Sequence, residues 1–121
     1  PPTQLYVPNL SSPRVYDTRT ASSGGPTKLA AGEERIVDML YPGPRSAVFN
    51  LTLAETEGTG GYVAAFAADQ VGPGNSSINW SSVGQIVANM VICPMDATGR
   101  IRIRGGSNNT HVIIDRICFF L

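Results

Sequence analysis

Hydrophobic residues lie along the chain in short runs that are separated by glycine, proline, serine and asparagine. In two of these runs, 47–53 and 100–104, apolar and polar residues alternate. An alternation with a period of two is typical of a strand that buries one face. We therefore expect both runs to be strands, with the isoleucines of 100–104 facing the core and its arginines facing outward.

The closing run, 111–121, is almost continuously apolar and contains one carboxylate, Asp115. A continuous apolar run of this kind indicates a central strand that is buried on both faces. Because an isolated buried charge is very costly, such a carboxylate needs a polar partner. We expect Asp115 to pair with Arg14 or Arg19.

Several other runs also have the length and the β-branched composition of strands, and no segment has a convincing helical period. Together they give about eight short strands at the spacing of an all-β domain, which we expect to be an antiparallel β-sandwich or jelly-roll-like fold. The further strand-like runs are 14–19, 35–40, 62–68, 77–80 and 87–93.

The length of 121 residues corresponds to one domain. The Pro-rich start reads as a linker or arm over residues 1–13, followed by a single β domain over 14–121. We expect this unit to be the C-terminal domain of a larger chain.

The charge and composition of the chain narrow the class of protein to which it could belong. Nine basic residues balance nine acidic ones, which argues against a nucleic-acid binder. A charged fraction of only 15%, together with many turn residues, is typical of an extracellular or virion-type domain. No apolar segment is long enough to cross a bilayer, so we expect no membrane insertion.

The two cysteines, Cys93 and Cys118, both lie in strand-like runs. The favoured interpretation is a pair of buried thiols, and the alternative is one inter-strand disulfide. With His111 as the single histidine, they do not make a zinc site. The chain also lacks a P-loop and a dinucleotide-binding fingerprint, so we expect no cofactor.

The sequence gives little support for catalysis. His111 and Asp115 fall on one strand, two pleats apart, which is too far for the carboxylate–imidazole bond of a triad. No G-x-S-x-G elbow occurs. The acidic pairs at 33–34 and at 55 and 57 read as solvated loop charges. We therefore expect a protein that is not an enzyme.

Two sets of side chains are candidates for ligand contact. The ladder Arg100, Arg102 and Arg104 could grip an anionic polymer, although pairing with acidic residues across the sheet is the favoured alternative. Tyr62 and Trp80 could stack on a sugar, although a lone tryptophan in a β domain more often packs in the core.

Polar residues within or beside the apolar runs form a third set. We expect them to hydrogen-bond to one another and to loop backbone groups, which would fix the strand register. The members of this predicted network are Arg14, Asp17, Arg19, Asn50, Asn79, Asn89 and Asp115.

From residue 14 onward, the order of several short motifs resembles a β-rich surface module of secreted actinobacterial proteins and of actinobacteriophage virion proteins. That module reads V-L-D-T-R, L-N-V-T, S-x-L-N-W, A-N and D-V-x-G-Y-F. This chain departs from it at Tyr16 and at 117–120. The matching segments are 14–19, 25–26, 47–52, 61–62, 73 with 77–80, 88–91, 99–101 and 111–120.

The resemblance implies an all-β, non-catalytic display module, and it assigns no binding residue. The expected function is therefore that of a virion surface protein of an actinobacterial phage, which decorates the capsid or tail and contacts other virion subunits. Adhesion to host-envelope glycans and homo-oligomer formation would fit the same role. The alternative is a carbohydrate-binding or adhesion module of a secreted actinobacterial protein.

Overall fold

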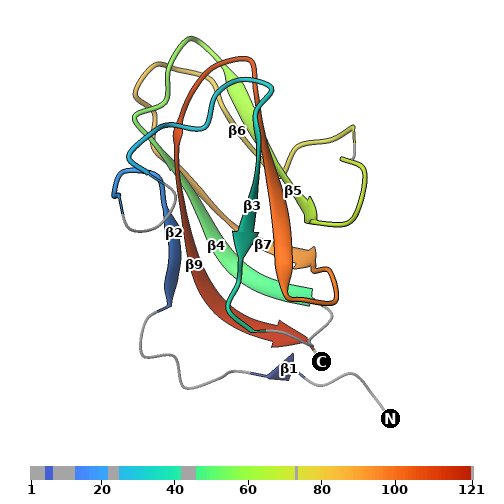
Figure 1. Ribbon diagram of the computed structural model, residues 1–121. Coiled ribbons are helices and arrows are strands. Elements are labelled where there is room, and N and C mark those ends of the chain that lie inside the picture. The colour runs from blue at the N-terminus through green and yellow to red at the C-terminus, as the bar shows by residue number, and fades with distance from the viewer. Residues whose placement is uncertain (1–4, 7–12, 22–24, 42–45, 73, 121) are drawn as a thin grey trace.

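The computed structural model describes residues 5–6, 13–21, 25–41, 46–72 and 74–120 (Figure 1). All regular secondary structure in these residues is β-strand, and they contain no helix that could cross a membrane. The strands are β1 (Leu5–Tyr6), β2 (Arg14–Asp17), β3 (Glu34–Asp38), β4 (Ser46–Ala54), β5 (Gly61–Ala67), β6 (Ile78–Trp80), β7 (Val87–Pro94), β8 (Arg100–Gly106) and β9 (His111–Phe120).

The strand pairing follows one long antiparallel hairpin whose turn lies between β5 and β6. Moving outward from this turn, β5 pairs with β6, β4 with β7, β3 with β8 and β2 with β9. Alternate pairs fall in different sheets, and β9–β4 and β8–β5 contacts join the pairs within each sheet. The resulting orders, β2-β9-β4-β7 and β3-β8-β5-β6, are those of an eight-stranded jelly roll.

This arrangement confirms the predicted all-β sandwich. The two sheets face each other in two layers (Figure 1). The short strand β1 extends the first sheet by pairing with Phe119 and Phe120 at the end of β9. Part of the predicted linker or arm is therefore a strand, whereas residues 1–4 and 7–12 lie outside the described residues.

The core lies between the sheets and is built from the alternating positions that the sequence indicated. Phe49, Leu51 and Leu53 of β4 have no exposed surface, and neither do Ile101 and Ile103 of β8. These inward side chains belong to one buried apolar cluster. Burial of apolar area at this interface is the main force that holds the two sheets together.

The expectation that the last strand is buried on both faces is only partly correct. β9 is an interior strand, paired with β1 and β2 on one side and with β4 on the other. Only its inner face is covered by the second sheet, so the Asp115 side chain on the outer face is 26% exposed. At Ile117, which is 41% exposed, the register with β4 shifts by one residue.

The two cysteines are buried free thiols, as the favoured interpretation predicted. Cys93 pairs with Ala47 on the inner face of the first sheet, whereas Cys118 pairs with Val48 on the outer face. The alternative disulfide is therefore wrong, because β4 separates side chains that point in opposite directions. Burial raises the pKa of Cys93 to about 12, so this thiol stays protonated at neutral pH.

Candidate functional site

Within the predicted polar network, the buried carboxylate is that of Asp17, at the end of β2. Asp17 is 3% exposed and accepts hydrogen bonds from the backbone amide, Nε and Nη2 of Arg19 at 2.9–3.0 Å. These bonds hold the pKa of Asp17 below its usual value. They also turn the chain away from the sheet, so β2 stops before the predicted end at residue 19.

Asp115 pairs with Arg14, which is one of the two partners predicted for it. The Nε and Nη2 atoms of Arg14 lie 2.8 and 3.2 Å from the Asp115 carboxylate. Arg14 Nη1 also lies 3.7 Å from Asp17. Four of the predicted network residues thus form a continuous series of ion pairs on the outer face, in the order Arg19, Asp17, Arg14 and Asp115.

The three asparagines of the predicted network do not join this series, so the expectation that they bond to other network members is wrong, whereas the bond of Asn89 to a loop carbonyl agrees with the prediction. Asn50 donates to Thr52 Oγ1 at 3.2 Å on the outer face of β4. Asn79 and Asn89 are exposed, and they bond to Ser76 Oγ and to the Ser77 carbonyl. Their apolar neighbours in sequence point to the other face of each strand or to an open edge.

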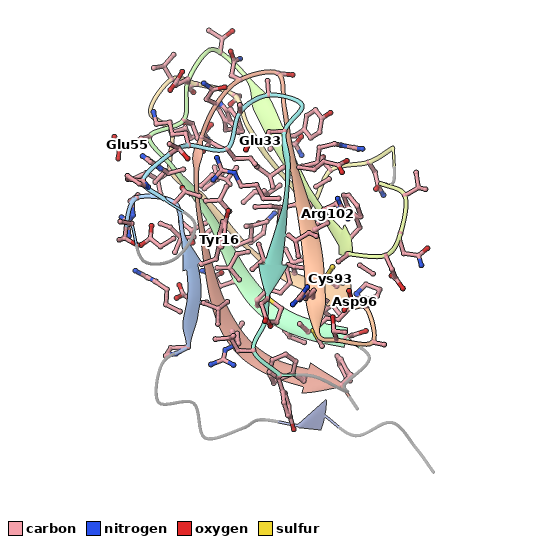
Figure 2. All side chains as sticks on the ribbon, viewed as in Figure 1. Tyr16, Glu33, Glu55, Cys93, Asp96 and Arg102 are labelled. Carbon is pink, nitrogen blue, oxygen red and sulfur yellow. The ribbon has the colours of Figure 1, made fainter. Side chains whose placement is uncertain are left out.

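A hydroxyl, an imidazole and a carboxylate meet where β2 and β4 end and β9 begins. Thr18 Oγ1 lies 2.9 Å from His111 Nδ1, and Glu55 Oε2 lies 3.8 Å from His111 Nε2. Glu55 is labelled at the upper left of the molecule in Figure 2. The sequence did not indicate this group of three side chains, because its residues come from three distant segments and no local motif joins them.

The hydrogen bonds of Thr18 show that this group of three side chains, Thr18, His111 and Glu55, holds the structure together. The Val112 amide donates to Thr18 Oγ1 at 2.8 Å, and the Thr18 amide donates to the Val112 carbonyl at 3.1 Å. Thr18 has no exposed surface, so its hydroxyl has no approach to a substrate in solvent. Its role is to fasten the end of β2 to β9.

The fold should weaken in mild acid because of His111. Burial is the main cause that lowers the pKa of His111; Lys28 and Arg19 also lower it, whereas Glu55 and Asp17 raise it. The unfolded chain therefore binds this proton more readily than the folded protein does. The stability that the neutral His111 side chain contributes is fully present above its unfolded pKa of 6.5. This contribution falls as the pH drops from there toward the lower folded pKa.

This prediction is checked by urea unfolding between about pH 7.5 and pH 5.5, where histidine is the side chain that titrates. His111 is the single histidine of the chain, so a His111→Asn variant should lose the slope of stability against pH in this range. An equal slope in the variant and in the original protein would show that other groups cause it.

The arginine ladder is largely paired across the sheet, which was the favoured interpretation. Arg102 Nη1 and Arg104 Nη1 lie 3.5 and 3.8 Å from the Glu34 carboxylate of β3. Arg102, which is labelled in Figure 2, also donates to the Ala68 carbonyl at 2.9 Å. A grip on an anionic polymer by the whole ladder is therefore not supported, and Arg100 is the member left exposed.

The two aromatic candidates occupy opposite environments. Trp80 is 4% exposed and donates its indole N–H to the Glu57 carbonyl at 3.0 Å, so it packs in the core, which was the favoured alternative to stacking on a sugar. Gly61 lets this ring pack against the β5 backbone. Tyr62, by contrast, is half-buried on the outer face of β5 and lines a hollow of about 350 Å³ with residues 74–76.

An exposed apolar surface lies on β7 and just before it. Met90 and Ile92 are 66% and 58% exposed on the outer face of β7, and Ile86 in the preceding loop is 71% exposed. We call these three residues the β7 strip. β7 ends the strand order of its sheet, so its outer edge has no paired strand among the described residues. The sequence pattern indicated a strand here but not this exposure.

Comparisons with protein-family models, with curated proteins and with solved structures gave no match. Within the part of the chain that the structure describes, no three His, Cys, Asp or Glu side chains are grouped so that they could hold a metal ion. The function therefore has to be argued from the surfaces of this chain.

Proposed function

We propose that this jelly roll is a non-enzymatic surface protein of a virion, a decoration domain of an actinobacterial phage that assembles through the β7 strip. The exposed apolar strip on an open sheet edge is the observation that carries the proposal. The motif order that resembles virion surface modules supports the setting. The buried Thr18 hydroxyl and the protonated Cys93 thiol fit a role without catalysis.

The fold is compatible with this role but does not decide it. Jelly rolls occur in viral capsid proteins and in lectins, so the architecture fits both virion assembly and sugar binding. What favours assembly is the position of the β7 strip. Side chains of this size on a solvated strand face are typical of a surface that another protein covers.

The edge of β7 differs from the other strand edges in the described residues. Natural sheets usually protect an open edge with charged residues or keep it short. β3 carries Glu34, Arg35 and Asp38, β2 carries Arg14 and Asp17, and β6 and β1 have only three and two residues. β7 has eight residues and no charge, so its edge is open to the addition of another strand.

The occupant that best fits this edge is a second copy of the chain. Two β7 strands related by a two-fold axis run antiparallel, so the apolar outer side chains of one copy lie beside those of the other. No like charges meet, because neither strand carries any. A symmetric pair would double the surface that a decoration domain presents to the virion subunits.

Sedimentation velocity tests this assembly. We expect the domain to self-associate at about 100 µM, and the double variant Met90→Asp, Ile92→Asp to weaken association at least about tenfold, because two carboxylates would enter an apolar contact. A matched control places two aspartates at other exposed apolar positions, Ile36 and Val71. This Ile36→Asp, Val71→Asp variant should associate like the original protein.

A domain that stays monomeric up to about 1 mM would contradict assembly through β7. Equal association of the strip variant and the original protein would also contradict it, because contact would then occur elsewhere on the surface.

A further inference from the structure

A second candidate surface lies on the other sheet, where Tyr62 lines a hollow of about 350 Å³ together with Gly74, Asn75 and Ser76. This volume is at the lower end of the range of small-molecule sites. The residues that line it bring one aromatic ring, one side-chain amide and one hydroxyl. No charged residue is among the described residues that line it.

The ring of Tyr62 is seated by a glycine on the neighbouring strand. Tyr62 pairs with Gly106 of β8, and a Cβ atom at Gly106 would come within 2.1 Å of the tyrosine ring. The tyrosine therefore lies directly over the backbone of Gly106. We regard Gly106 as a positioning residue, because any side chain there would push the ring out of place.

The lining segment, residues 74–76, is held against the sheet by hydrogen bonds of Ser76 and of the next residue, Ser77. The Ser77 amide donates to the Val63 carbonyl at 2.9 Å, and Ser77 Oγ accepts from the Ala65 amide at 3.0 Å. Ser76 Oγ bonds to Asn79 Oδ1 at 3.1 Å. These bonds hold the end of the lining segment beside the Tyr62 ring before any ligand binds, which lowers the entropic cost of binding.

We propose that this hollow binds one or two residues of a neutral glycan. The face of the Tyr62 ring provides an amphipathic platform for the apolar face of a sugar ring. The Asn75 amide and the Ser76 hydroxyl can each donate to or accept from sugar hydroxyls. An anionic glycan is a poorer fit, because the nearby Arg104 is already engaged with Glu34 and Phe66.

The position of the hollow makes this inference independent of the β7 strip. Tyr62 projects from the outer face of β5 in the sheet β3-β8-β5-β6, whereas Met90 and Ile92 project from the outer face of the other sheet. A domain that assembles through β7 would therefore keep the hollow open on the opposite face. Failure of either experiment leaves the other result standing.

The test is an NMR titration of the ¹⁵N-labelled domain with maltotriose, cellotriose, mannotriose and galactotriose, with a hyaluronan tetrasaccharide as the anionic comparison. We expect saturable shifts for at least one neutral trisaccharide, centred on Tyr62 and residues 74–76, with a dissociation constant of about 0.1–10 mM. The hyaluronan fragment should bind more weakly.

Three variants and one control distinguish the loss of the aromatic platform from damage to the fold. Tyr62→Phe keeps the aromatic face and should bind within about threefold of the original, whereas Tyr62→Ala should weaken binding at least about tenfold. Gly106→Ala keeps the identity of every lining residue but displaces the Tyr62 ring, so it should also weaken binding. Ile36→Ala, on the same outer face but outside the hollow, should bind like the original protein.

The absence of saturable shifts with all four neutral trisaccharides up to about 20 mM would overturn the proposal. Shifts centred away from the hollow, or tighter binding of the hyaluronan fragment, would also overturn it. If Tyr62→Ala fails to give a folded spectrum, Gly106→Ala decides, and unchanged binding by that variant would count against the site.

Discussion

Replacement of Phe49 by alanine is expected to lower the free energy of unfolding by about 3–5 kcal/mol. Phe49 has no exposed surface and lies on β4, which is paired on both sides by β7 and β9. A strand held on two sides cannot move inward to fill the space left by a lost ring. The effect would remove a large part of the roughly 5–15 kcal/mol that stabilises a domain of this size.

Urea unfolding, followed by the fluorescence of Trp80, measures this change, because that indole is buried in the same cluster. Ile36→Ala is the control, since this side chain is 49% exposed and its truncation should cost less than about 1 kcal/mol. Equal losses at the two positions would show that the core does not lie between the sheets as described.

Replacement of Asp17 by alanine should be the most damaging change in the polar cluster, with a cost of about 2–4 kcal/mol. The carboxylate is buried, and three donors of Arg19 converge on it. Its removal leaves the Arg19 amide without this acceptor and frees the turn that follows β2. Because the folded pKa of Asp17 is lowered, this contribution is present above the unfolded pKa of 3.8 and is lost as the pH falls below it.

The matched control is Asp115→Ala, which should cost less than about 1 kcal/mol. Its partner Arg14 is 49% exposed, and ion pairs with such solvent access contribute little. Chemical unfolding of the two variants at neutral pH distinguishes the sites. A larger loss at Asp115 than at Asp17 would show that Asp115 holds the buried end of the ion-pair series.

The parts of the fold that could be predicted are those that the local pattern encodes. Strict alternation in 100–104 marked both the strand and its buried face, and the structure places Ile101 and Ile103 in the core as expected. The cost of leaving a carboxylate without a partner indicated that Asp115 pairs with an arginine, Arg14 or Arg19, and the structure shows that the partner is Arg14. In each case, the residue types within one short segment indicated that a side chain is buried or needs a partner.

What could not be predicted depends on which segments the topology brings together. Thr18, Glu55 and His111 meet only because β2 and β4 end, and β9 begins, at one corner of the sandwich. The apolar run of β7 looks like that of a buried strand, and only its place at the end of the sheet exposes Met90 and Ile92. The position of each strand in the sheets also decides that Trp80 lies inside the sandwich and that Tyr62 lies on its outer face.

Amide hydrogen exchange along β7 tests the central claim most directly, because it observes the proposed contact strand itself. The β7 amides that do not bond to β4 should exchange rapidly in dilute solution, where the edge is open. We predict that these amides become protected as the concentration rises to about 1 mM, while the Met90→Asp, Ile92→Asp variant stays unprotected. Equally fast exchange of these amides in the original protein at both concentrations would contradict assembly through β7.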